Sequence, residues 1–302
     1  MAAKHNSILF GHVMGHLVPG TMFLLFGFWW LCNVVNDILI SQLERVDEAR
    51  PYKARTWYGR SKPFTGRCTR KHLVDPFIKI ALSLIGASME LTSADWTLFN
   101  DKGDFEHESI NNFSHATMFA FFGLTGVVDI LQTIGTIRSK HFGGLGHVLM
   151  AMAFFVEGLL FYYHLDGRNA LDSHAHCIVY SICFATTLVL LLETIWMDSG
   201  VLGLARCFLV LLQGTWFYQV AFMLYGPRKW STKSKAAAMF VPVAFAWHCL
   251  MLLIVFCVVL AVGGRCISGV WIRSSDCETI SREQLLKNES TEQEILNEEE
   301  DL

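Results

Sequence analysis

A carboxylate and an imidazole lie two helical turns apart in an apolar stretch of this chain. Glu157 interrupts the apolar run that ends at Tyr163, and His164 follows directly. A spacing of seven residues corresponds to about two turns of α-helix, so both side chains are expected on one helix face. A carboxylate within hydrocarbon is costly unless its charge is compensated, and it commonly marks a functional site.

Other ionisable groups occur near the ends of other apolar stretches, at depths that favour one membrane face. Imidazole and carboxylate are the ligand types that zinc prefers, and a catalytic zinc keeps one position open for water. The candidate metal ligands or acid–base groups are Glu157, His164, His176, His248 and His115. The wider polar pocket is predicted to include His16, Glu90, Asp129, Asp172, Gln213 and Gln219.

This set of residues fits three classes of protein. The first is a non-enzymatic multi-pass protein whose polar set is a hydrogen-bonded core, with membrane lipid and other membrane proteins as partners. The second is a zinc-dependent intramembrane lipid hydrolase. The third is a proton-coupled carrier that uses Glu157, Asp129 and His248. We favour the first, because the chain has no contiguous metal motif such as HExxH; it also has no nucleotide fingerprint, and no nucleic-acid partner is expected.

The elements that must position these groups are predicted to be transmembrane helices. Of the 302 residues, 53% are hydrophobic and 17% are charged, whereas soluble domains carry about a quarter of charged residues. A helix needs about 20 apolar residues to cross a bilayer. The sequence therefore predicts an all-α polytopic membrane protein, a seven-transmembrane helix bundle. The spans are expected near residues 18–40, 77–93, 113–137, 148–163, 177–196, 202–225 and 237–262.

Charge distribution sets the expected orientation and the domain limits. The loop at 41–74 carries nine lysines and arginines, so the positive-inside rule places it in the cytosol. The N-terminus is then outside or lumenal and the C-terminus cytosolic, although the basic loop before the last span disagrees. We expect a short segment at 1–17, a transmembrane domain at 18–262 and an acidic, disordered cytosolic tail at 263–302.

Five blocks within the predicted spans are characteristic as a set. They are GHLVPGTMFLLFGFWW (15–30), TMFAFFGLTGVVDIL (117–131), FVEGLLFYYHLDGR (155–168), LLQGTWFYQVAFMLY (211–225) and AWHC (246–249). With them the chain resembles the transmembrane protein 45 family, which includes the transmembrane epididymal proteins. It departs at Ser114-His115, where the family often has two histidines. The resemblance implies an integral membrane protein of endomembranes (Golgi or endolysosomal) or of the plasma membrane, without an established biochemical activity.

Overall fold

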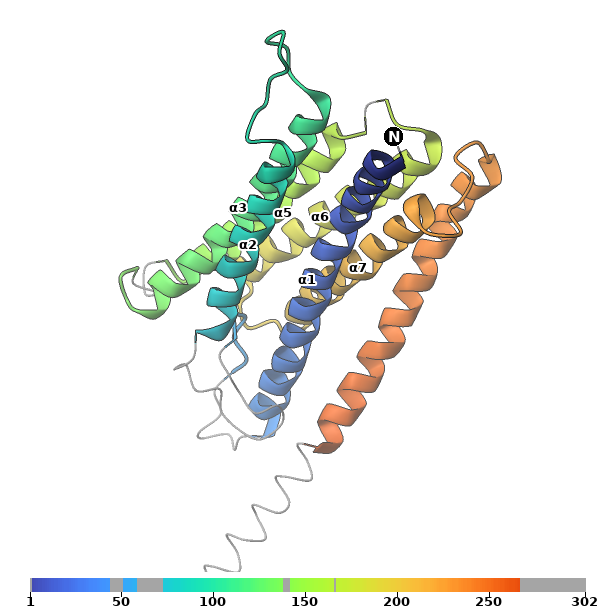
Figure 1. The fold of residues 1–302 in the computed structure, drawn as a ribbon. Coiled ribbons are helices and arrows are strands. Elements are labelled where there is room, and N and C mark those ends of the chain that lie inside the picture. Colours follow the sequence, from blue (N-terminus) through green and yellow to red (C-terminus); the bar gives the residue numbers. More distant parts are fainter. Residues whose placement is uncertain (1, 44–50, 59–72, 138–141, 166, 267–302) are drawn as a thin grey trace, which may run out of the picture.

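The protein is a bundle of long helices. The structure is a computed structural model that describes residues 2–43, 51–58, 73–137, 142–165 and 167–266. The helices are α1 (Ala2–Leu43), α2 (Val74–Ser93), α3 (His107–Thr133), α5 (Leu145–Tyr163), α6 (Ala170–Ile195) and α7 (Gly200–Tyr225), followed by the helix Lys235–Cys266 (Figure 1). Apart from one isolated bridge between Phe99 and Phe105, these described residues contain no strand pairing. The predicted all-α, polytopic architecture is confirmed.

Six of the described helices are long and apolar enough to cross a membrane. The exception is α2, which carries three charged residues, Asp75, Lys79 and Glu90, and lies along α3. The helix α1 begins at Ala2, so the expected short N-terminal segment is continuous with the first span. The predicted acidic tail lies outside the described residues from 267 onward, as do residues 44–50 and 59–72 of the basic loop.

The helices pack as neighbouring pairs joined into one bundle. The most extensive contacts join α1 to α7, α2 to α3 and α5 to α6, while α6–α7 and α3–α5 contacts connect the pairs. The helix Lys235–Cys266 lies on the outside of α7, where Phe245 and Phe256 contact Trp216 and Phe208. Most of its apolar side chains are exposed, as expected for a surface that faces lipid.

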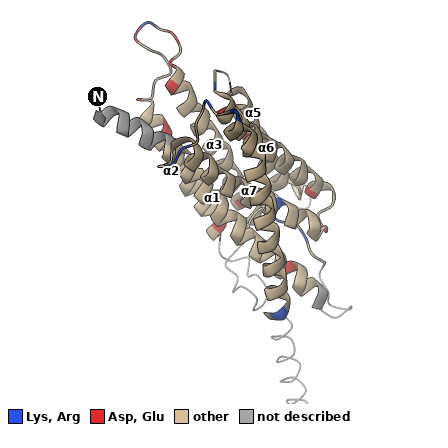
Figure 2. Ribbon diagram, turned by 90° about the vertical axis from the view of Figure 1, so that its right-hand side faces the viewer, with Lys and Arg blue, Asp and Glu red and all other residues tan. Residues whose placement is uncertain are grey.

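Charged side chains are concentrated at the two ends of the bundle, and the helix bodies are almost free of them (Figure 2). The few exceptions are buried, which is the usual arrangement for ionisable groups inside a membrane protein. Several of these buried charges lie at the end of the bundle near residues 51–58, which we call the inner end. A cavity extends from there toward the opposite end.

A short extended segment closes the inner end of the bundle. Residues 51–58 have no helical structure, and every second side chain is buried. The buried ones are Tyr52, Ala54, Thr56 and Tyr58. The backbone amide of Ala54 donates to the carbonyl of Met197 at 2.6 Å, which ties the segment to the turn between α6 and α7. Part of the predicted polar loop is therefore core.

Close approach of α1 and α7 depends on glycine. A Cβ atom at Gly214 would lie 2.9 Å from the Leu24 amide nitrogen and 3.0 Å from the Gly20 carbonyl oxygen, both of them backbone atoms that cannot move aside cheaply. Small residues at membrane helix interfaces permit this kind of backbone contact. The same argument does not apply to Gly15, which has open space around it.

We therefore expect Gly214→Ala to lower the stability of the purified protein by about 1–3 kcal/mol, the usual cost of overpacking. Thermal unfolding in detergent measures the change. Gly15→Ala is the matched control, because it makes the same chemical change in α1 without a clash. Equal melting temperatures for the two variants would contradict the proposed packing.

Candidate functional site: a cavity with a polar mouth

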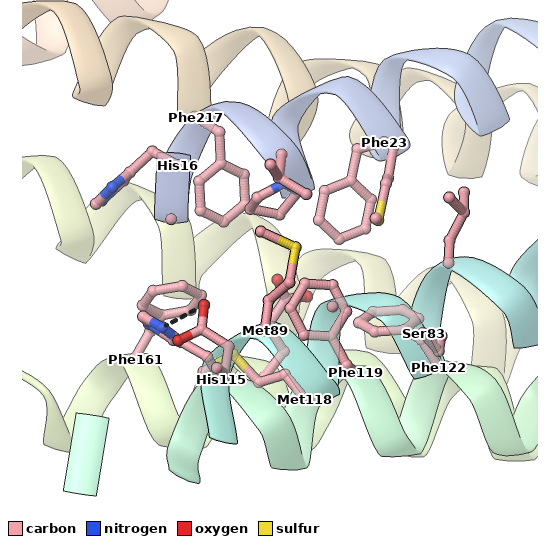
Figure 3. Close-up of a pocket in the computed structure, with 18 of the residues that line it drawn as sticks. His16, Phe23, Ser83, Met89, His115, Met118, Phe119, Phe122, Phe161 and Phe217 are labelled. Atoms are coloured by element: carbon pink, nitrogen blue, oxygen red, sulfur yellow. Dashed lines mark ion pairs between the residues drawn. The ribbon is translucent and has the colours of Figure 1, made fainter. Parts of the chain in front are cut away.

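An elongated cavity of about 640 Å³ runs through the bundle, lined by side chains of α1, α2, α3, α5, α6 and α7. Figure 3 shows it between α1 and α7 on one side and α2 and α3 on the other. One end is rich in histidine and charged groups, the middle is lined by phenylalanine and methionine, and the far end reaches Lys79. It is thus an apolar cavity with a polar group at each end.

Four histidines from four parts of the fold form a row around the mouth. They are His16 on α1, His176 on α6, His164 at the end of α5 and His115 on α3. Ring centroids lie 5.7 Å apart for His16 and His176, 6.0 Å for His176 and His164, and 6.2 Å for His164 and His115. All four line the cavity.

Charged groups hold the histidines of the mouth in place. Asp172 contacts both the Arg168 guanidinium and His176 Nδ1 at 2.7 Å, one with each carboxylate oxygen. Arg168 also donates to the backbone carbonyl of His164 at 2.7 Å and contacts the His164 ring. Burial, and then the neighbouring Arg168 charge, lower the pKa of His164 to about 3. On the α2 side, Glu90 lies 3.4 Å from His115 Nδ1.

A second, more polar hollow of about 480 Å³ adjoins the mouth. Its lining is His107, His164, Gly167, Arg168, Asn169 and Asp172. His164 and Arg168 line both spaces, so the polar hollow and the apolar cavity share a wall. The Asn169 side chain begins α6 by accepting a hydrogen bond from the Asp172 amide, which fixes the helix start beside these groups.

Five of the phenylalanines that line the middle of the cavity contact one another. Phe23 of α1 stacks on Phe217 of α7 with centroids 5.9 Å apart, and it also contacts Phe122 and Phe154. Phe122 and Phe154 meet edge to face at 5.1 Å, and Phe161 lies 5.8 Å from Phe217. Such mutual ring contacts add about 0.5–1.5 kcal/mol each beyond burial, so these walls are well ordered.

Glu157 lines the cavity within this aromatic region. Its side chain is 3% exposed, and Oε1 accepts a hydrogen bond of 2.8 Å from Gln213 Nε2 on α7. The Cys183 thiol of α6 lies beside the carboxyl group. Among the described residues, no nitrogen or oxygen atom donates a hydrogen bond to Oε2. Apart from the weak donor of the Cys183 thiol, the carboxyl group therefore has an oxygen without a partner in a buried position on the cavity wall.

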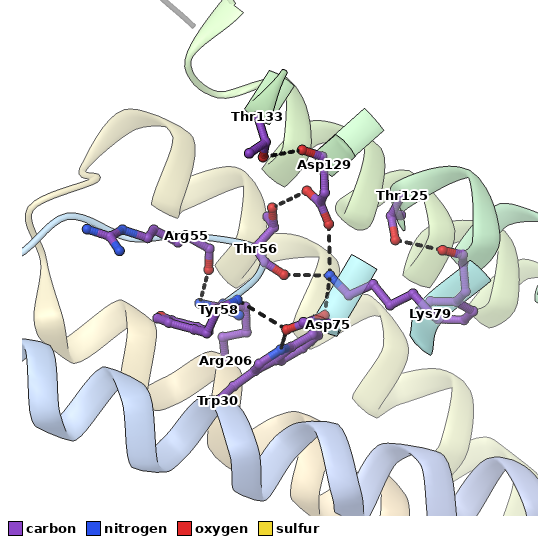
Figure 4. A network of polar contacts seen from close by, with 11 residues as sticks. Trp30, Arg55, Thr56, Tyr58, Asp75, Lys79, Thr125, Asp129, Thr133 and Arg206 are labelled. Carbon is purple, nitrogen blue, oxygen red and sulfur yellow. Dashed lines mark hydrogen bonds and ion pairs between the residues drawn. The ribbon is translucent and has the colours of Figure 1, made fainter. Parts of the chain in front are cut away.

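At the inner end, Lys79 joins α2, α3 and the 51–58 segment (Figure 4). Its ammonium group lies 2.9 Å from Asp129, 3.2 Å from Asp75 and 2.7 Å from the Thr56 carbonyl. The Thr56 hydroxyl donates to Asp129, and Trp30 Nε1 donates to Asp75. Every charge in this group has an opposite charge and a hydrogen bond, which is what a buried ionic cluster requires.

A second buried ion pair completes the inner end. Arg206 of α7 donates to Glu193 of α6 at 2.7 Å and to the Arg55 carbonyl at 2.8 Å. Its guanidinium carbon and Lys79 Nζ each lie 5.2 Å from the Trp30 ring centroid. Tyr52 packs against Gly203, and burial raises the pKa of its hydroxyl. Two cations thereby fix the 51–58 segment across the end of the bundle.

The structure brings most of the sequence-predicted residues together. The predicted residues that line the cavity are His16, Glu90, His115, Glu157, His164 and His176. Asp172 supports the mouth, and Gln213 lies behind Glu157. Asp129 belongs instead to the Lys79 cluster, and His248 packs against Trp216 with centroids 5.6 Å apart. Gln219 is half-buried and does not line the cavity.

The predicted metal ligands do not form a preassembled zinc site among the described residues. Within the part of the chain that the structure describes, no three His, Cys, Asp or Glu side chains are close enough to hold one metal ion. The mouth histidines already contact one another, Asp172, Arg168 or Glu90. Zinc binding by the predicted residues stays a prediction.

Several important residues were missed at the level of sequence. Asp75 and Lys79 stand at i and i+4 at the start of the second apolar stretch, and Arg206 lies inside the sixth. Charged residues at such positions were a usable signal, because intramembrane charges are rare and are commonly paired. The burial of residues 51–58 had no comparable signal, because their many polar and basic neighbours resemble an ordinary cytosolic loop.

Comparison with known proteins finds similarity in the stretch that contains Glu157 and two of the four mouth histidines, His164 and His176. Residues 143–261 match a family of unknown function, DUF716. The resemblance predicted from the sequence is confirmed. The matched stretch contains α5, α6, α7 and most of the last helix, and so includes Glu157, His164, His176 and His248.

Three curated proteins show the same similarity. Human transmembrane epididymal protein 1 is 28% identical over 137 residues, which is 44% of this chain and 50% of that protein. Mouse transmembrane epididymal protein 1A is 26% identical over 137 residues, and rat transmembrane epididymal protein 1 is 27% identical over 138; each match covers 44% of both chains. The similarity thus spans about half the length of these relatives. This chain is a multi-pass membrane protein similar to them.

Removing the central cation should destabilise the inner end. We expect Lys79→Met to cost about 3–5 kcal/mol, because it leaves Asp75 and Asp129 buried without their counter-charge. Thermal unfolding in detergent checks this, with the exposed loop residue in Lys102→Met as control. Adding Asp75→Asn and Asp129→Asn to Lys79→Met should restore most of the loss. A single Lys79→Met variant as stable as the control would show that the cluster does not stabilise the fold.

Proposed function

We propose that this protein binds a lipid-like amphiphile in its central cavity. The single observation that carries the proposal is the cavity itself, about 640 Å³ in volume, apolar along its length and polar at its mouth. Small-molecule sites are typically about 300–1,000 Å³, mostly apolar, with a few placed polar groups. An apolar chain or ring system in the aromatic section and a polar group among the histidines match this distribution.

Helix packing supports entry from the membrane. The helices α1 and α2 both line the cavity, yet each packs extensively on a different partner, α7 and α3 respectively. Their side chains meet at the inner end, where Trp30 donates to Asp75. Toward the mouth the cavity lies between them, which favours lateral entry of a lipid from the outer half of the bilayer.

We also propose that α2 crosses the membrane as a seventh span, with the N-terminus outside or lumenal and the C-terminus cytosolic. The helix runs along α3, and its two ends, at Val74 and Ser93, lie toward opposite ends of the bundle in Figure 1. Its charges favour this, because Asp75 and Lys79 neutralise each other inside the bundle. The compartment is proposed to be the Golgi, the endolysosomal system or the plasma membrane.

The hydrolase and carrier alternatives draw on the same residues. A hydrolase needs a water-activating group beside the cavity mouth, and a carrier needs access from both sides. The inner end is closed by the 51–58 segment and two ion clusters, so binding with access from one side is the function that the geometry favours.

Blocking the cavity should prevent lipid binding. We expect Met22→Trp, which adds bulk to a cavity-lining position, to lower photo-crosslinking by a diazirine-labelled lysophospholipid about tenfold. Leu25→Trp is the matched control, because Leu25 lies on the same helix and is 65% exposed. Purified protein in nanodiscs and peptide mapping give the readout. Equal labelling of both variants, or labels outside the cavity lining, would refute the proposal.

The proposed topology is testable in sealed microsomes with a membrane-impermeant maleimide. Cysteines in Lys53→Cys and Thr136→Cys should react directly from the cytosolic side, whereas Lys102→Cys should react only after detergent is added. All three positions are exposed in the fold. The unsubstituted protein gives the background from native cysteines. If Lys53→Cys and Lys102→Cys react from the same side, α2 does not cross the membrane.

A further inference from the structure

The strongest unexplained feature of the cavity is the Glu157 carboxyl group, whose second oxygen has at most the weakly donating Cys183 thiol beside it. Gln213 donates a hydrogen bond to one oxygen of this group. The other oxygen, Oε2, has no nitrogen or oxygen donor among the described residues, although Glu157 is only 3% exposed. A buried polar atom without a partner costs about 1–3 kcal/mol, and a buried charge without a partner costs more. A buried carboxylate oxygen without a strong donor from the protein points to a donor supplied by a ligand in the cavity.

The surroundings of Glu157 narrow the chemistry of that donor. Phe154 and Phe161 lie three residues before and four residues after it, so all three side chains share one face of α5 and line the cavity. Phe217 contacts Phe161, and Phe122 contacts Phe154, so phenylalanine rings from α3, α5 and α7 line the same cavity as Glu157. Aromatic faces attract cations, and a cage of them with a carboxylate is a common way to bind an ammonium group.

The pairing of the other buried charges also indicates that a counter-charge for Glu157 would come from a ligand. Among the described residues, the buried cations Lys79 and Arg206 are held by Asp75, Asp129 and Glu193 at the inner end. Arg168 at the mouth is held by Asp172. None of these ion pairs includes Glu157, so an ionised Glu157 would draw its counter-charge from the occupant rather than from this part of the chain.

We infer that the cavity selects an amphiphile with a protonated amine, and that Glu157 receives the ammonium group within the phenylalanine cage. This deepens the proposed function and rests on it. The amine donates to Oε2, its positive charge neutralises the carboxylate, and its apolar body fills the methionine- and phenylalanine-lined space. A long-chain amine lipid and a compact aromatic amine share this chemistry, and the size of the cavity admits both classes.

Competition in nanodiscs tests the inference with defined probes. Hexadecylamine and the compact tricyclic amine imipramine each compete with the diazirine lysophospholipid, and hexadecanol is the uncharged comparison. We expect at least one amine to compete at an about tenfold lower concentration than hexadecanol. Success of hexadecylamine alone indicates an amine lipid, and success of imipramine alone indicates a compact amine. If neither amine surpasses hexadecanol, the inference is overturned.

Variants of two cavity-lining glutamates locate the effect. Glu157→Gln should abolish the preference for the amine over hexadecanol, because the amide keeps the shape of the side chain but carries no charge. Glu90→Gln, the same change at the mouth, should retain the preference. Loss of the preference in Glu90→Gln alone would assign the amine to the mouth and refute the role of Glu157. The Met22→Trp variant tests a different claim. Its labelling shows whether lipid binds in the cavity at all, and it does not report on the preference for an amine.

A measurement on the unsubstituted protein covers the case in which Glu157→Gln does not fold. Dicyclohexylcarbodiimide modifies carboxyl groups in apolar surroundings, and mass spectrometry of peptides locates the adduct. We expect the competing amine to protect Glu157 from modification and hexadecanol to protect it less. Equal protection by the two compounds would contradict an ammonium–carboxylate contact.

Discussion

Neutralisation of buried charge is the constraint on which the inner half of this structure depends. Lys79 places one ammonium group between carboxylates of α2 and α3 and the backbone of the 51–58 segment. Arg206 makes the equivalent connection from α7 to Glu193 and to the same segment. Because these charged side chains are buried, separating any of the elements would leave a charge without its partner. The ionic clusters therefore join α2 to α3 and α6 to α7 at this end of the bundle, in addition to their apolar contacts.

The two ends of the cavity differ in how completely their polar groups are used. At the inner end each charge has a partner from the protein, whereas Glu157 retains an oxygen without one. At the mouth, histidines from four parts of the fold surround a space that shares a wall with a polar hollow. This difference separates a structural end from an end that can receive a ligand. It explains why a similar set of ionisable residues serves two purposes within one bundle.

The sequence predicts the helices well because apolar length is a local property, and the confirmed family resemblance agrees with that architecture. It predicts the convergence of His115, His164 and His176 because each lies at the same end of its helix. It does not predict the partner of Asp129. The position of Asp129 along α3 does not indicate that the neighbouring helix is α2 or that Lys79 faces it. Nor does it predict the burial of Thr56 and Tyr58, which depends on a gap left by helices far away in the chain.

The docking of residues 51–58 also constrains how the protein can be assembled. The segment follows the first helix, but its anchors, Met197, Gly203 and Arg206, are made about 150 residues later. During synthesis, residues 51–58 therefore cannot reach their final contacts until α7 emerges. The ribosome completes most of the chain before the first loop can take its final place, so this early part of the sequence is among the last to mature.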